Sequence, residues 1–167
     1  MGDHSRQTPE NYQVLNYLEG IWMGEGQAQF PTTDSFEYRE RLRFERRDEN
    51  TLAYEQRAEK RPLGQTEFRP SHWESGFLRI LPTGDLELIN TQSGGRLEAL
   101  TGTAEFVGNQ IKVTFISRLL TNDERMVATG RTFEIEGDTL RYEMAMHMTR
   151  VDALMPHLAA TLRRVRS

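Results

Sequence analysis

The stretch Gly20-Ile-Trp-Met-Gly-Glu-Gly26 decides the fold of this chain. Its three glycines alternate with Trp22 at the spacing of a β-strand, in which every second residue faces the same side. Glycine inside a strand marks a sharp bend or the close approach of another group. The same face continues through Ala28 to Phe30, so two aromatic rings flank three tiny residues. Such a strand is typical of a barrel wall that curves around something large and flat, or of an ordinary glycine-kinked first strand.

The rest of the chain alternates between apolar and polar residues, with short polar turns between the segments. A helix is predicted from Pro9 to Leu18, capped by Thr8 and followed by Gly20. Because barrel closure removes sheet edges, we predict an all-β fold, an antiparallel ten-stranded up-and-down β-barrel with a short N-terminal helix. A two-layer sandwich is the structural rival. The predicted strands are 21–30, 36–47, 50–60, 72–81, 85–91, 96–106, 109–119, 125–136, 138–149 and 157–165.

Composition limits the class of protein. The chain has 167 residues, a net charge of -4 and a sequence pI of about 5.6, which argues against nucleic-acid binding. We expect one domain over residues 9–167, after a flexible tail at 1–8. No apolar run approaches the roughly 18 residues of a membrane span and no signal peptide opens the chain, so we expect a cytoplasmic protein without a membrane partner. The absence of cysteine excludes disulfides and thiolate metal ligands.

Alternation also predicts which side chains point into the barrel. In strand 138–149, Tyr142, Met144 and Met146 share the inward face, and His147 is expected in solvent. A methionine row is usually plain core, but it also suits an adaptable pocket wall. The other residues predicted to point inward are Phe36, Tyr38, Leu42, Phe44, His72, Glu74, Gly76, Leu78, Ile80, Ile111, Val113, Phe115, Leu119, Val127, Thr129, Arg131, Phe133, Ile135, Leu140 and Met148.

Four segments resemble, in the same order, segments that identify the nitrobindin family of small haem-binding β-barrels. They are Gly20–Gly26, Pro31-Thr32 with Phe36-Glu-Tyr38, His72–Arg79, and Pro156-His157-Leu158, and together they extend over residues 20 to 163. The resemblance implies a fatty-acid-binding-protein-like barrel that holds largely ferric haem b, binds nitric oxide and isomerises peroxynitrite to nitrate. It leaves open a homodimer, and whether the role is scavenging, sensing or transport.

His157 is the residue that we single out. Because proline does not fit within a central strand, Pro156 places His157 at the start of a strand on a rim. Its face then holds Ala159 and Thr161, whose small side chains leave room for a planar macrocycle. A lone histidine is more often a surface or packing residue, but the resemblance assigns His157 as the catalytic iron ligand. A neutral imidazole is the usual proximal ligand of haems that bind gases or peroxides.

Four further residues are candidate haem contacts. The resemblance places His72 on the distal side of the pocket, not bonded to iron, and the alternative is a rim histidine paired with Glu74. It also places Thr32 in a loop at the rim. Thr129 and Arg131 are polar residues in an apolar inward row, and they need partners because buried unpaired polar groups are costly. Haem propionates would supply these partners, and an internal salt bridge or a rim position is an equal alternative.

Two other functions stay open at this point. The same barrel without iron would carry a fatty acid or another small hydrophobic ligand, whose carboxylate Arg131, Arg39 or Arg57 would bind. A barrel with a filled core would be purely structural. His157 separates these functions, because a lipid carrier does not need it. The chain has no nucleophile elbow, phosphate loop or dinucleotide fingerprint. The resemblance implies a haem enzyme, a peroxynitrite isomerase.

Overall fold

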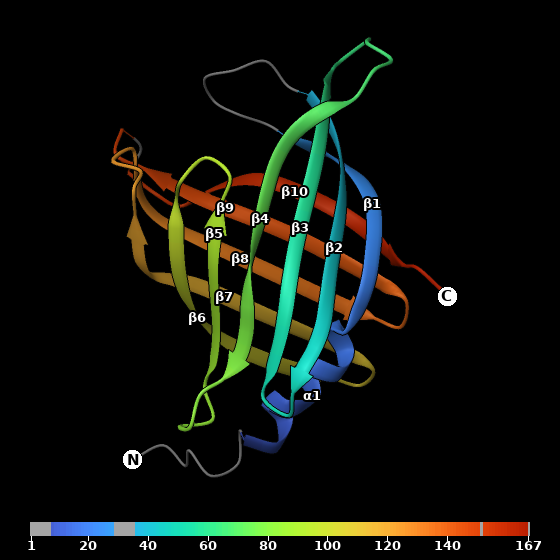
Figure 1. The fold of residues 1–167 in the computed structure, drawn as a ribbon, viewed down its shortest axis with the longest axis vertical. Coiled ribbons are helices and arrows are strands. Elements are labelled where there is room, and N and C mark those ends of the chain that lie inside the picture. Colours follow the sequence, from blue (N-terminus) through green and yellow to red (C-terminus); the bar gives the residue numbers. More distant parts are fainter. Residues whose placement is uncertain (1–7, 29–35, 151, 167) are drawn as a thin grey trace.

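The computed structural model describes residues 8–28, 36–150 and 152–166. Within them, one helix precedes ten β-strands that close into an antiparallel barrel (Figure 1). Each strand pairs with the next one along the chain, and β1 pairs with β10 to complete the circle. The elements are α1 (Thr8–Leu18), β1 (Gly20–Ala28), β2 (Phe36–Asp48), β3 (Thr51–Pro62), β4 (Arg69–Ile80), β5 (Leu86–Gln92), β6 (Leu97–Val107), β7 (Gln110–Thr121), β8 (Met126–Glu136), β9 (Thr139–Met148) and β10 (Met155–Arg164).

This architecture confirms the predicted up-and-down barrel and excludes the two-layer sandwich. Each predicted strand overlaps an observed one, with ends that differ by a few residues. The predicted face of β1 is confirmed as far as Gly26, while Phe30 lies outside the described residues.

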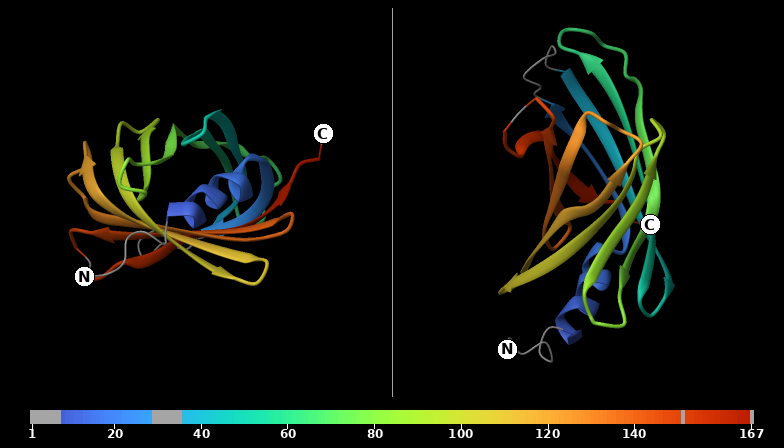
Figure 2. Two further views of the ribbon diagram at one scale, coloured as in Figure 1. Left: turned by 90° about the horizontal axis from the view of Figure 1, so that it is seen from below. Right: turned by 90° about the vertical axis from the view of Figure 1, so that its left-hand side faces the viewer.

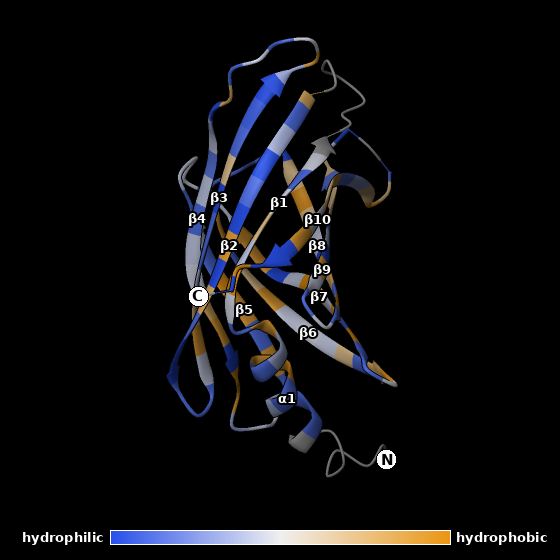
Figure 3. Ribbon diagram, turned by 90° about the vertical axis from the view of Figure 1, so that its right-hand side faces the viewer, coloured by the Kyte–Doolittle hydropathy of each residue, from blue (hydrophilic) through white to orange (hydrophobic). Residues whose placement is uncertain are grey.

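Helix α1 covers one end of the barrel (Figure 2). Val14, Leu15 and Leu18 point into the barrel and have no exposed surface, because their spacing places them on one side of the helix. Figure 3 shows hydrophobic and hydrophilic residues side by side along α1. Asn11 Nδ2 donates a hydrogen bond to the backbone oxygen of Gly84 in the β4–β5 turn, at 2.7 Å. No helix in the described part of the chain is long and apolar enough to cross a membrane.

The first and last strands hold the C-terminal end of α1. Trp22 Nε1 donates a hydrogen bond to the backbone oxygen of Leu18 at 2.8 Å. Arg164 donates to the backbone oxygens of Glu19 and Tyr17, the latter at 2.8 Å, and its guanidinium lies 4.1 Å from the centre of the Trp22 ring. These contacts supply partners for carbonyl groups that a helix end leaves unpaired.

The glycines of β1 are required by close approach. A Cβ atom on Gly24 would lie 2.2 Å from the backbone oxygen of Thr161, and one on Gly26 would lie 2.2 Å from that of Ala159. A Cβ on Gly26 would also lie 2.8 Å from the ring of Tyr38. The neighbouring strand and a tyrosine ring therefore occupy the space that the glycines leave.

Most residues predicted to point inward are indeed buried or packed against the core. Four aromatic rings form the centre of the core, with Phe133 in contact with Phe44, Phe115 and Tyr142. Met146 is partly buried against the same core. The confirmed and fully buried residues are Tyr38, Leu42, Phe44, Glu74, Leu78, Ile80, Ile111, Val113, Phe115, Thr129, Arg131, Phe133, Ile135, Leu140, Tyr142 and Met144.

The prediction for Leu119 is wrong because of a β-bulge. The pairing of β6 with β7 moves from Ala99–Leu119 to Leu100–Ser117, which leaves Arg118 as an extra residue on β7. One extra residue reverses the alternation beyond it. Leu119 therefore points outward and is 58% exposed.

A second β-bulge overturns the prediction for Val127. The pairing of β8 with β9 shifts between Met126 and Ala128, so Val127 is exposed and Met126 is buried in its place. The same shift lies opposite His147, which is half-buried and not in solvent as predicted. Period-two alternation does not encode such insertions.

Candidate functional site

A charged cluster lies inside the barrel, in the half away from α1. Arg131 donates hydrogen bonds through Nη1 and Nη2 to both carboxylate oxygens of Glu74, with an Nη2–Oε2 distance of 3.2 Å. Arg131 Nη2 also donates to Glu98 Oε2 at 2.9 Å. The hydroxyl of Tyr54 donates to Glu74 Oε1 at 3.0 Å, and Thr129 Oγ1 donates to Glu98 Oε1 at 3.2 Å. We call these five residues the Arg131 cluster.

The charges of the Arg131 cluster fix its protonation. Burial alone would raise the pKa of Glu74, but the charge of Arg131 and a hydrogen bond from His72 outweigh it and lower the pKa to about 2. Burial likewise opposes the charge of Arg131, yet the nearby negative groups, Glu74 first, raise its pKa well above the usual value. The pair is therefore ionised at physiological pH, as a buried hydrogen-bonded ion pair must be to persist.

His72 sits at the rim above this cluster. Its Nε2 atom lies 2.9 Å from Glu74 Oε2, and its side chain is 28% exposed. Ala58 of β3 is its neighbour across the strand pair. The structure thus matches the alternative of a rim histidine paired with Glu74, and the contact of His72 with haem stays a prediction.

β10 carries a β-bulge at His157, where its pairing with β9 shifts register. The face predicted for this strand is wrong, because Ala159 and Thr161 are exposed. Leu158 and Ala160 pack toward the core instead. Bulges re-aim side chains and are common next to functional sites.

His157 is a neutral imidazole at physiological pH. Its side chain is half-buried, and burial, followed by the positive charge of Arg96, lowers its pKa to about 4. A neutral imidazole can bind a metal ion through a ring nitrogen. Leu158 beside it, and Met144 and Met146 on the paired strand, form an apolar wall.

The other predicted site residues fall in different places. Thr32 lies outside the described residues. Thr129 and Arg131 have their partners within the protein, so the internal salt bridge is the alternative that the structure bears out for Arg131. Arg39 and Arg57 are exposed and paired with surface glutamates, so the idea that they bind a ligand carboxylate in the barrel is wrong.

Sequence reasoning missed several interior residues, among them Tyr54 and Glu98 of the Arg131 cluster. Glu40 is 3% exposed, and Gln56 is 1% exposed. The signal for Glu40 was present, because the alternation that places Tyr38 and Leu42 inward places Glu40 between them on the same face. A search for apolar inward residues alone passes over it.

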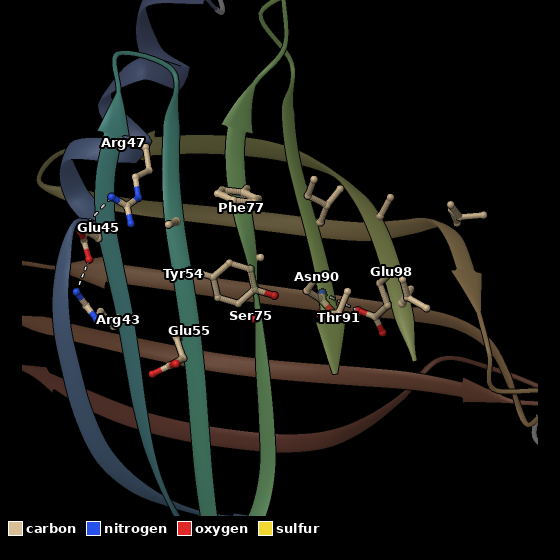
Figure 4. A pocket seen from close by; sticks show the side chains of 16 residues that line it. Arg43, Glu45, Arg47, Tyr54, Glu55, Ser75, Phe77, Asn90, Thr91 and Glu98 are labelled. Atoms are coloured by element: carbon tan, nitrogen blue, oxygen red, sulfur yellow. Dashed lines mark hydrogen bonds and ion pairs between the residues drawn. The ribbon is translucent and has the colours of Figure 1, made fainter. Parts of the chain in front are cut away.

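A groove of about 630 Å³ crosses β2 to β7 on the barrel wall (Figure 4). Figure 4 shows Arg43, Glu45 and Arg47 at one side of this groove and Phe77 further along it. The strand register aligns five small or apolar residues across the groove, Ala53, Phe77, Ile89, Ala99 and Leu119.

The homodimer that the sequence leaves open stays a prediction, and the mass in solution tests it.

Comparison with known proteins identifies the fold family. The model of the THAP4-like, heme-binding beta-barrel domain matches residues 11–164. The chain belongs to this family. The resemblance inferred from four sequence segments is thereby confirmed.

Named relatives of this THAP4-like domain are similar over nearly their whole length. A protein of Arabidopsis thaliana named peroxynitrite isomerase Rv2717c is 36% identical over 148 residues, which cover 89% of this chain and 85% of the relative. The peroxynitrite isomerase of Mycobacterium leprae is 32% identical over 155 residues, 91% and 93% of the two chains. The crystal structure of Rv2717c from M. tuberculosis matches with a TM-score of 0.79 and 31% identity, over 93% and 98%.

The residues of this THAP4-like barrel fit a haem group. His157 offers a neutral nitrogen, and Leu158, Met144 and Met146 offer an apolar wall beside it. In the described residues, no group of three or more histidine, aspartate or glutamate side chains could hold a metal ion. An iron centre here would therefore take its other ligands from the porphyrin.

Proposed function

We propose that the end of the barrel away from α1 binds ferric haem b through His157, binds nitric oxide and converts peroxynitrite to nitrate. The observation that carries this proposal is a half-buried, neutral imidazole at a β-bulge beside an apolar wall. Membership of a family described as heme-binding and relatives named peroxynitrite isomerase support it.

The protein residues have simple roles in this mechanism. When bound, haem iron supplies a Lewis acid that weakens the O–O bond of peroxynitrite. His157 would hold the iron through a ring nitrogen, and Met144, Met146 and Leu158 would keep water from the ring. His72, held by Glu74, would contact the bound group from the rim. Isomerisation involves no net proton transfer, so the site needs no general base.

The alternative of a fatty-acid carrier has less support. In the described part of the chain, Arg131 is the one cationic residue that is fully buried. Glu74 and Glu98 already neutralise it. A ligand carboxylate would have to displace one of them, which would leave a buried charge without a partner.

Titration with hemin, followed by absorption, tests the binding step. The wild type should bind about one hemin per chain and give a Soret band, and His157→Ala should lose it, because no other axial nitrogen is assigned. His147→Ala is the matched control, since it removes another half-buried histidine and should bind hemin normally. Equal spectra and affinities for His157→Ala and wild type would refute the assignment.

Stopped-flow decay of peroxynitrite tests the chemical step. Haem-loaded protein should speed the decay, raise the nitrate yield and lower the nitration of added tyrosine. Apo protein and free hemin at the same iron concentration are the controls. A haem-loaded protein no faster than buffer would leave haem binding without isomerase activity.

A further inference from the structure

Glu40 is a buried carboxylic acid to which the proposed function gives no role. It points inward from β2 and is 3% exposed. Neither of its carboxylate oxygens has a hydrogen-bond partner of good geometry among the described residues. A buried carboxylate without a partner is costly, so its charge state must depend on what lies near it.

Among the described residues, no cation near Glu40 pairs with Glu40 alone. The side-chain oxygens of Tyr38, Gln56 and Tyr142 also lack hydrogen-bond partners in the described structure. Gln56 lies close to both Glu40 and Tyr142. The unpartnered atoms of this group are two tyrosine hydroxyls, one amide oxygen and the carboxylate oxygens of Glu40, and none of them carries a positive charge.

The other described cations in the barrel interior already have carboxylate partners. Arg131 binds Glu74 and Glu98, and Arg96 Nε lies 3.2 Å from Glu98 Oε1. Two cations therefore face three carboxylates, because Arg96 Nη1 also lies 3.6 Å from Asp123 Oδ2. An ionised Glu40 adds one negative charge that no described side chain in the interior compensates.

This excess sets the protonation of Glu40 in the empty barrel. Burial, and then the charge of Glu74, raise the pKa of Glu40 to about 8, although Arg131 and Gln56 act in the opposite direction. At neutral pH the carboxyl group therefore keeps its proton. Tyr38 and Tyr142 add no charge, because burial raises the pKa of each hydroxyl.

The strand register places Glu40 in one row with His72. Gly24 of β1 and Ala58 of β3 are its cross-strand neighbours, and neither carries a charge. Ala58 is in turn paired with His72 of β4, at the rim. Glu40 and His72 thus flank one small residue in a single row.

We propose that Glu40 is the counter-charge for a porphyrin whose metal core is positive, holding a proton in the empty barrel and releasing it when such a porphyrin binds. The O–H bond of the carboxyl group breaks, the proton goes to solvent, and no electron is transferred. The core of ferric protoporphyrin carries one positive charge, whereas that of zinc protoporphyrin is neutral. This inference rests on the proposed haem binding, and it predicts that only the ferric porphyrin is linked to Glu40.

Paired titrations with hemin and zinc protoporphyrin between about pH 6 and about pH 8 test it. Release of one proton should make hemin binding tighter by up to about tenfold per pH unit, while zinc protoporphyrin should show no such rise. His157 is already neutral in this range and cannot cause the effect. Glu40→Gln should flatten the hemin profile and leave zinc protoporphyrin unchanged. Glu45→Gln, an exposed position on the same strand, is the control and should behave as wild type.

Two further measurements complete the test. The first uses wild-type protein only, so it does not depend on the folding of a variant, and the second uses no porphyrin. In weakly buffered solution near pH 7, wild-type protein should release about one proton per hemin bound and none per zinc protoporphyrin. Without porphyrin, Glu40→Gln should raise the melting temperature more at pH 8 than at pH 5. A group whose pKa rises from 4.5 to about 8 on folding costs stability as pH rises through that window.

The outcomes separate the two proposals. If neither porphyrin binds, the haem proposal fails and the role of Glu40 fails with it. If both bind but wild type and Glu40→Gln share the same pH profile, haem binding stands and the role of Glu40 is refuted. Equal proton release with hemin and zinc protoporphyrin would also refute it.

Discussion

The two ends of the barrel are built from different chemistry. At the end that α1 covers, Val14, Leu15 and Leu18 pack on apolar strand residues and belong to the same core. In the opposite half, Arg131 and its glutamates occupy the interior, and His72 and His157 lie further toward the rim. Apolar packing does not depend on the protonation of side chains, whereas a buried ion network does. Apolar packing and the buried ion network therefore occupy separate halves of one closed sheet.

The largest effect on this comparison should come from Arg131→Met. The substitution leaves Glu74 and Glu98 buried without their shared cation, which typically costs about 3–5 kcal/mol in the free energy of unfolding. Urea unfolding monitored by tryptophan fluorescence measures it. The triple variant Arg131→Met, Glu74→Gln, Glu98→Gln should recover part of the loss. A single variant as stable as wild type would mean that the network is not the rigid element of this half.

Leu15→Ala should have the next largest effect, at the other end. Leu15 is fully buried under the barrel, and removing its side chain should cost about 3 kcal/mol. Hemin affinity of the folded protein should stay within about twofold, because the proposed haem site lies in the opposite half. Hemin titration well below the melting temperature checks this. A large loss of affinity would contradict the separation of the two halves.

Arg39→Ala should have the smallest effect. Arg39 pairs with Glu59 on the outer surface, where both side chains are well exposed. Solvent-exposed ion pairs contribute less than about 1 kcal/mol. Thermal unfolding at low and high salt should show a small change that shrinks with salt. A loss comparable to that of Arg131→Met would show that the outer wall matters as much as the interior.

The sequence predicts the fold better than it predicts the fine structure of the site. Alternation locates the ten strands because each has one face on the core. The spacing of the glycines in β1 also predicts that another group approaches this strand closely. The faces of Leu119, Val127 and Ala159 are misassigned, since a β-bulge adds one residue and leaves no mark in the pattern.

The interior charges show a second limit of sequence reasoning. The need of Arg131 for a partner was predictable, but its partners come from β4 and β6, and only the closed sheet brings these strands opposite β8. Glu40 was visible on an inward face, yet its excess charge emerges only after every other interior charge has found its counterpart. Which side chains pair across the barrel depends on the three-dimensional fold, and the residue pattern of a single strand does not predict it.

The closure between β1 and β10 has a consequence for biosynthesis. Arg164 and Tyr17, 147 residues apart, are hydrogen-bonded across this junction. The ribosome delivers β10 last of the ten strands, so the nascent sheet exposes two unpaired edges until that strand is made. His157 lies on the same strand. A chain interrupted before β10 has neither a closed wall nor His157, so it would lack the proposed haem ligand.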